Sequence, residues 1–102
     1  MSVSLERELR SLLKTGKAYL GVKQTLKALM HGAAKLVIIA ENMPPEYRAR
    51  IKYYAKLSHT PIIVFKGTSV DLGLIIGKPF RVSAIAVIDE GSSRILELAE
   101  GA

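Results

Sequence analysis

The segment 21–27 carries side chains suited to binding a polyanion. It opens with Gly21, and a glycine allows a sharp turn of the backbone and close approach by another backbone. Helical spacing then puts Lys23 and Lys27 on one exposed ridge, with Gln24 beside them. Lysines supply positive charge, glutamine can hydrogen-bond a base edge in two directions, and the first turn of a helix offers free N–H groups to phosphate. These residues are equally compatible with an ordinary solvated helix face.

A second candidate is the segment 78–82, in which Phe80 follows Pro79 and lies between two cations, Lys78 and Arg81. This is an unusual place for a core aromatic residue. In RNA recognition, unstacked bases rest on aromatic rings or on guanidinium planes. The alternative is that Phe80 folds back to cap the sheet, and the residues alone leave both interpretations open.

Other chemistries find little support. The segment 73–78 resembles a phosphate-binding loop only superficially, because three residues separate its glycines where four are needed, and Pro79 stands where Ser or Thr would bind magnesium. His31 and His59 have no second histidine or carboxylate at ligand spacing, so no metal site is expected. Ser83 has no evident base, and no nucleophile, base and oxyanion stabiliser come together. We therefore expect neither catalysis nor a cofactor.

Composition narrows the class of protein. The 102 residues fit one domain spanning 1–102, and 49% of them are apolar, enough for a core. The absence of cysteine excludes disulfide scaffolds, thiolate metal sites and cysteine nucleophiles. No apolar run reaches the roughly 20 residues needed to span a bilayer. The N-terminal residues lack the apolar block of a secretory signal, so we expect a cytoplasmic protein that does not bind membranes.

The charges are distributed unevenly along the chain. Residues 1–66 carry twelve basic and four acidic side chains, a net charge of +8, whereas residues 67–102 carry three basic and five acidic ones, a net charge of −2. A surface that is merely solvated has no need of such asymmetry. The imbalance favours a polyanionic partner.

The elements that must position these residues alternate between helical and strand patterns with short connections. A continuous apolar run at 35–40 is typical of a strand covered on both faces, which implies helices on either side of a sheet. The alternating order therefore predicts an α/β fold, a small sheet between helices. The expected helices lie at 4–15, 22–31, 44–57 and 68–75, the expected strands at 17–20, 35–40, 62–65 and 82–88, and residues 94–98 fit either a strand or a helical turn.

Helical periodicity also predicts which side chains face the core. Ser4 and either Thr68 or Ser69 are the expected N-caps of the first and fourth helices. The expected buried stripe of the second helix is Val22, Leu26, Leu29 and Met30. That of the third helix is Tyr47, Ile51, Tyr54 and Ala55. Arg48, Lys52 and Lys56 are expected on the opposite face of the third helix.

Several segments, in order and at the right spacing, together resemble the ribosomal protein L-thirty-e family of archaea and eukaryotes. They read TGK and GVKQTLK (15–17 and 21–27), GAAKLVIIAEN (32–42), IKYYAKLS (51–58), GTSVDLG (67–73) and GKPFRVS (77–83). The likeness covers nearly the whole chain.

The resemblance implies a three-layer α/β/α sandwich with a four-stranded mixed sheet, and binding to a kink-turn in large-subunit ribosomal RNA. In that family the RNA surface forms where the first strand–helix junction, the loop after the second strand and the loop before the last strand converge. Both segments chosen above on chemical grounds fall there. The RNA-binding residues that the resemblance implies are Gly21, Lys23, Gln24, Lys27, Glu41, Asn42, Pro79, Phe80, Arg81, Val82 and Ser83.

The resemblance also implies separate roles for these residues. The polar side chains of segment 21–27 would meet the sheared purine pairs and the backbone beside the kink. Asn42 would hydrogen-bond the RNA, with capping of a helix as its alternative role. Phe80 would stack on a flipped-out nucleotide, Arg81 would meet phosphate, and Val82 would pack against a base.

At one position the chain departs from a sibling family. The L-seven-Ae family and its small-RNP relatives carry Asn-Glu where this chain has Lys23 and Gln24. This places the chain with the L-thirty-e family, which implies a constituent of the large subunit in the cytoplasmic ribosome, monomeric when free, with neighbouring ribosomal proteins as further partners. Two alternatives stay open, namely a kink-turn protein of a non-ribosomal small RNP and a protein-interaction adaptor on the same fold. An adaptor should be acidic or neutral on the convergent face, and Lys23, Lys27 and Arg81 argue against that.

Overall fold

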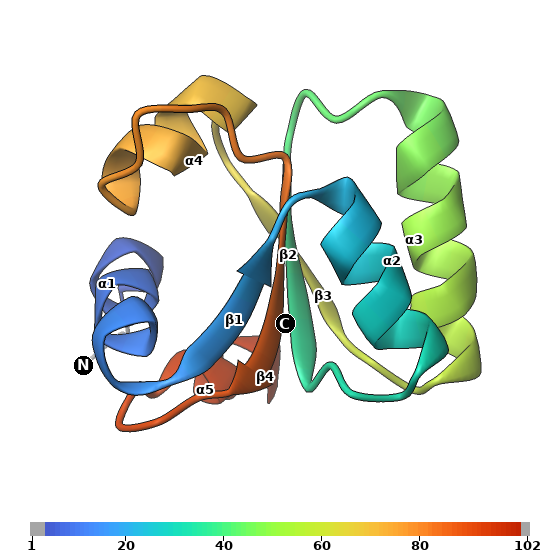
Figure 1. The fold of residues 1–102 in the computed structure, drawn as a ribbon, viewed down its shortest axis with the longest axis horizontal. Coiled ribbons are helices and arrows are strands. Elements are labelled where there is room, and N and C mark those ends of the chain that lie inside the picture. Colours follow the sequence, from blue (N-terminus) through green and yellow to red (C-terminus); the bar gives the residue numbers. More distant parts are fainter. Residues whose placement is uncertain (1–3, 101–102) are drawn as a thin grey trace.

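Five helices and four strands make up residues 4–100, the part of the chain that the computed structural model describes (Figure 1). Residues 1–3, which belong to the segment inspected above for a secretory signal, lie outside it, as do residues 101–102. The helices are α1 (Leu5–Thr15), α2 (Val22–Met30), α3 (Pro45–Leu57), α4 (Ser69–Ile75) and α5 (Ile95–Glu100), and the strands are β1 (Lys17–Leu20), β2 (Leu36–Ala40), β3 (Ile62–Phe65) and β4 (Ala84–Asp89).

The four strands form one sheet in the order β1-β4-β2-β3. β4 runs antiparallel to both of its neighbours, whereas β2 and β3 run parallel to each other. β1, β2 and β3 therefore end at the same edge of the sheet, and β4 begins there. We call this edge, with its segments 21–24, 40–44, 66–69 and 77–83, the loop edge, and it lies at the top of Figure 1.

Helices cover both faces of the sheet, which confirms the predicted three-layer α/β/α sandwich with a four-stranded mixed sheet. α2 and α3 pack on one face through Leu26 and Ile51. α1, α4 and α5 pack on the other through Leu12, Leu72 and Ile95. Every residue of β2 is buried, as expected for a strand covered on both sides. Within residues 4–100, no helix is both long and apolar enough to cross a membrane.

The ends of several helices follow the local sequence signals. The Ser4 hydroxyl accepts a hydrogen bond from the Arg7 N–H at the start of α1. Thr68 caps α4 in a reciprocal capping box with Asp71, which satisfies two backbone N–H groups at the start of the helix. Residues 95–100 form the helix α5, which decides between the two alternatives left open for the C-terminal segment.

The structure corrects three expectations. The last strand begins at Ala84 and not at Val82, because the Val82 N–H donates to the Ser69 carbonyl at 3.0 Å instead of joining the sheet. Met30 and Tyr47, which periodicity placed in buried stripes, are 53% and 40% exposed. Both line an open groove between α2 and α3, so neither side chain is covered by the sheet.

Candidate nucleic-acid interface

The N-terminus of α2 is open at the loop edge. Gly21 has a φ of 101°, a conformation that favours glycine, and its N–H donates to the Ala84 carbonyl at 2.7 Å. The N–H groups in the first turn of a helix have no partner within the helix, and no side chain caps those of α2. Lys23, Gln24 and Lys27 are exposed beside them. An anion placed here would meet free N–H groups, the positive end of the helix dipole and two lysines.

The segment 77–83 is held in place by its backbone against α4. The Lys78 N–H donates to the Gly73 carbonyl at 2.9 Å, and the Val82 N–H donates to the Ser69 carbonyl at 3.0 Å. A Cβ added to Gly73 would lie 2.1 Å from the carbonyl oxygen of Phe80, so only glycine lets the helix and the loop approach this closely. The Phe80 side chain nevertheless stays 55% exposed. Its ring is therefore presented to solvent and does not cap the sheet.

Asn42 ties the loop between β2 and α3 to the start of α4. Its Oδ1 accepts a hydrogen bond from the Ser69 N–H at 2.8 Å, across 27 residues of sequence. The Ser69 carbonyl in turn accepts from the Val82 N–H. One buried serine thus connects the loop that carries Asn42 with the segment that presents Phe80. Asn42 therefore does cap a helix, and the helix that it caps is α4.

Arg48 fixes the same loop from α3. Its Nη2 donates to the Glu41 carbonyl at 2.6 Å, and the Glu41 N–H donates to the Gly67 carbonyl at 3.0 Å. Arg48 is half-buried in this position, whereas Lys52 and Lys56 remain exposed on the basic face predicted for the helix. The guanidinium of Arg48 is therefore engaged with the backbone of the loop.

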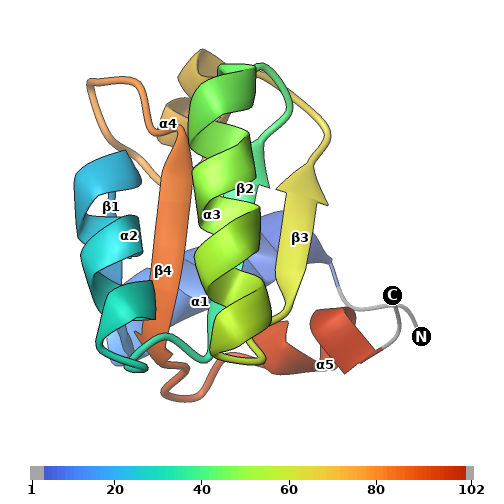
Figure 2. The same cartoon turned by 90° about the vertical axis from the view of Figure 1, so that its right-hand side faces the viewer.

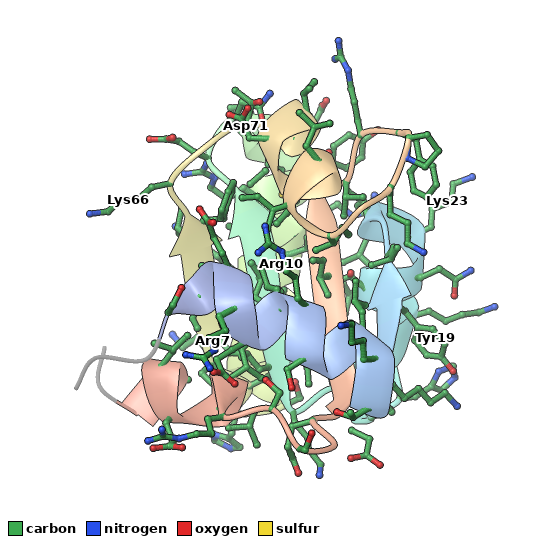
Figure 3. The ribbon with its side chains drawn as sticks, turned by 90° about the vertical axis from the view of Figure 1, so that its left-hand side faces the viewer. Arg7, Arg10, Tyr19, Lys23, Lys66 and Asp71 are labelled. Atoms are coloured by element: carbon green, nitrogen blue, oxygen red, sulfur yellow. The ribbon has the colours of Figure 1, made fainter. Side chains whose placement is uncertain are left out.

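The predicted segments all reach the loop edge. Figures 1 and 3 show segment 77–83 and the start of α2 at the same end of the sheet. Pro79 and Arg81 are exposed, and Ser83 is half-buried. Val82 is the exception, because its side chain is 1% exposed and belongs to the core. The predicted packing of this side chain against a base is wrong for this conformation, since it offers a base no surface.

The cations of the loop edge are free of salt bridges within the described residues. The ion pairs that residues 4–100 form join Lys35 to Glu90, at the opposite edge of the sheet, and Arg94 to Glu97. The same part of the chain contains no cluster of His, Asp and Glu that could hold a metal ion. The charges available to a polyanion at this edge are those of Lys23, Lys66, Lys78 and Arg81, with Lys27 one turn further along α2.

Sequence reasoning missed the residues that organise this edge. Gly73 carried a usable signal, because a glycine inside a helix costs about 1 kcal/mol relative to alanine and indicates close packing. Ser69 was expected only as a possible cap, and nothing local indicates its bond to Asn42. Val70 and Leu74, on the exposed side of α4, share a shallow pocket of about 200 Å³ with Phe80 and were not singled out either.

A cationic edge with an exposed aromatic ring, carried on an α/β/α sandwich, has the features of an RNA-binding module. A family model described as "Ribosomal protein L7Ae/L30e/S12e/Gadd45 family" matches residues 4–97. The chain therefore belongs to this family, which confirms the resemblance seen in its motifs.

Curated relatives agree over nearly the full chain. The chain is 56% identical over 100 residues to "Large ribosomal subunit protein eL30" of Aeropyrum pernix, covering 98% of this chain and 100% of the relative. It is 46% identical over 99 residues to the protein of that name from Methanocaldococcus jannaschii, covering 97% and 90% of the two chains. The corresponding protein of Saccharolobus solfataricus is 46% identical over 96 residues, covering 94% and 89%.

Proposed function

We propose that this protein is a structural constituent of the large ribosomal subunit that binds a kink-turn in ribosomal RNA through the loop edge. It works in the cytoplasm as part of the ribosome, as one domain spanning 1–102, and is a monomer when free. The role is architectural and not catalytic. Its family and its large-subunit relatives support this assignment.

The observation that carries the proposal is the convergence of two different binding features at one edge. The open N-terminus of α2 offers N–H groups and lysine charge, and segment 77–83 offers the exposed ring of Phe80. A sharply bent RNA concentrates phosphate charge on its inner side and exposes unstacked bases at the bend. A rigid basic edge with a ring beside it meets both requirements.

The roles proposed for single residues are those that the family resemblance implies, and the exposure of these side chains supports them. Lys23, Gln24 and Lys27 lie at the helix end, where they reach the sheared purine pairs and the adjoining backbone. Phe80 stacks on the flipped-out nucleotide, and Arg81 meets a phosphate. The Oδ1 of Asn42 already accepts a hydrogen bond from the Ser69 N–H, so Asn42 contacts RNA through its Nδ2 amide.

A binding titration tests this function. The probe is a short kink-turn RNA at two salt concentrations, and the control is the same RNA with its sheared G·A pairs changed to Watson–Crick pairs. We expect tight binding to the kink-turn and a large loss on the control. Equal, salt-sensitive binding to both RNAs would reject kink-turn recognition, because it would show only the attraction of basic charge for RNA.

A further inference from the structure

A groove of about 930 Å³ runs between α2 and α3 from the open N-terminus of α2. Figure 2 shows these two helices side by side on one face of the sheet. The groove has an apolar floor and a cationic rim. The floor includes Leu26, Met30 and Tyr47, and the rim consists of Lys23, Lys27 and Arg50.

Two of the apolar side chains in the floor, Met30 and Tyr47, are unusually accessible. Met30 is 53% exposed and Tyr47 is 40% exposed, although both stand at positions where helical spacing predicts burial. A thioether and a half-exposed phenol ring offer a flat apolar surface to a planar group. A nucleobase that has left its stack is such a group, and bases rest on aromatic rings of this kind.

The charge of the rim selects the occupant. The lining, all of it within the described residues, contains three cations and no carboxylate. Arg50 is exposed and forms neither a hydrogen bond nor an ion pair with the part of the chain that the structure describes. A second copy of this chain would bring the same cations against these and be repelled, whereas an RNA strand would bring phosphates.

The groove is also continuous with the loop edge. Lys23 and Lys27 line the groove and, at the same time, flank the open helix end that receives the kink in the proposed function. A strand that leaves the kink across α2 is therefore directed into the groove. A peptide partner would gain nothing from this connection, because the adjoining site is one proposed for RNA.

We propose that this groove is a second RNA site, which takes a single-stranded segment leaving the kink-turn. An unpaired base lies on Tyr47 and Met30, and a phosphate beside it is met by Arg50. The site rests on the proposed function, because the kink must first bind at the loop edge to deliver the strand.

The test compares three RNAs, one blunt and two extended, and three variants by fluorescence anisotropy. The blunt RNA is a minimal kink-turn with blunt stems, and the extended RNAs carry a short single-stranded extension, placed on each strand in turn. Stacking on an aromatic ring contributes roughly 1–3 kcal/mol per base, so the extension on the correct strand should raise the affinity of the unsubstituted protein roughly 5- to 150-fold. Arg50→Gln and Tyr47→Ala should reduce this gain while leaving the affinity for the blunt RNA unchanged.

Lys56→Gln is the matched control, because it removes one exposed charge from the same helix outside the groove. This variant should show the same increase in affinity on addition of the extension as the unsubstituted protein. Equal affinity of the unsubstituted protein for blunt and extended RNA would overturn the groove site, and so would the same gain in Arg50→Gln as in Lys56→Gln. Failure of the unsubstituted protein to bind the blunt kink-turn is a separate outcome, which rejects the proposed function and, with it, the groove site.

Discussion

Replacing Phe80 by alanine separates the two roles open to this ring, recognition and folding. Phe80 is 55% exposed, and its segment is held by the backbone bonds of Lys78 and Val82, which alanine at position 80 does not remove. Full burial of a phenylalanine side chain contributes about 1.5–3 kcal/mol. With less than half of the ring buried, we expect Phe80→Ala to lower the free energy of unfolding by only about 1 kcal/mol.

The effect on RNA binding should be larger than the effect on stability. If the ring stacks on a flipped-out nucleotide, its loss removes about 1–3 kcal/mol of binding free energy, which raises the Kd roughly 5- to 150-fold. Stacking involves no counterion release, so the dependence of the affinity on salt should stay the same.

The assay is a titration with kink-turn RNA at two salt concentrations, paired with chemical unfolding of the same preparations. Tyr53→Ala is the control, because Tyr53 is an aromatic residue of α3 that is 60% exposed and lies outside the loop edge. This variant should bind RNA normally. A Phe80→Ala protein that binds RNA normally but has lost several kcal/mol of stability would refute the reasoning, since the ring would then belong to the core.

Four further variants probe other parts of the structure. Lys27→Gln should lower the slope of log affinity against log salt by about one unit, because one phosphate contact is lost, and an unchanged slope in the titration would remove Lys27 from the interface. Asn42→Ala should lower the free energy of unfolding by about 1–3 kcal/mol in chemical denaturation, because the N–H of buried Ser69 loses its acceptor, and it should weaken RNA binding as well. Val82→Ala should lower the free energy of unfolding by about 2 kcal/mol, and a loss of affinity without loss of stability would contradict its place in the core. The hydrogen bond from Arg94 holds the pKa of Glu97 below its ordinary value, against an opposing effect of desolvation and with a smaller contribution from the charge attraction between the two side chains. The small stabilisation from this pair is therefore present at neutral pH and is lost as the pH falls through that lowered pKa. Glu97→Gln should therefore show a smaller loss of thermal stability on acidification than the unsubstituted protein, and an identical pH profile would remove the pair as a source of stability.

Most of the fold was predictable because its signals are local. The apolar run at 35–40 indicated a strand buried on both faces, and β2 is such a strand. The errors occur where burial depends on a neighbour. Periodicity indicates which side of a helix faces inward, but it does not indicate how far the sheet or the next helix extends. Met30 and Tyr47 lie on the inward-facing stripes and are left uncovered because they line a groove between α2 and α3.

The candidate interface was predictable only in part, for a related reason. Lys23 and Phe80 could be chosen from the sequence because each residue type is unusual for its position. Lys23 is a cation at the start of a helix, and Phe80 is an aromatic residue in a loop between two cations. The hydrogen bond that the Ser69 N–H donates to Asn42 depends on the strand order, which brings the ends of β2 and β3 together with the segment before β4. Val82 was expected to begin the last strand and to face a base, but it precedes that strand. Its N–H donates to the Ser69 carbonyl, and its side chain packs in the core.

The candidate interface combines a segment whose backbone is held by hydrogen bonds with lysine side chains that are exposed and unpaired within residues 4–100. The backbone of segment 77–83 is held by Gly73 and Ser69 before any RNA arrives, so presenting Phe80 requires little further loss of conformational entropy. The exposed lysines at the start of α2 have no salt-bridge partner among residues 4–100, so they can adjust to the phosphates they meet. The held segment is suited to discriminating a flipped-out base, and the exposed lysines to attracting RNA of any sequence. Affinity should therefore come mainly from the lysines and depend on salt, whereas preference for the kinked RNA should come mainly from the Phe80 segment and persist when salt is raised.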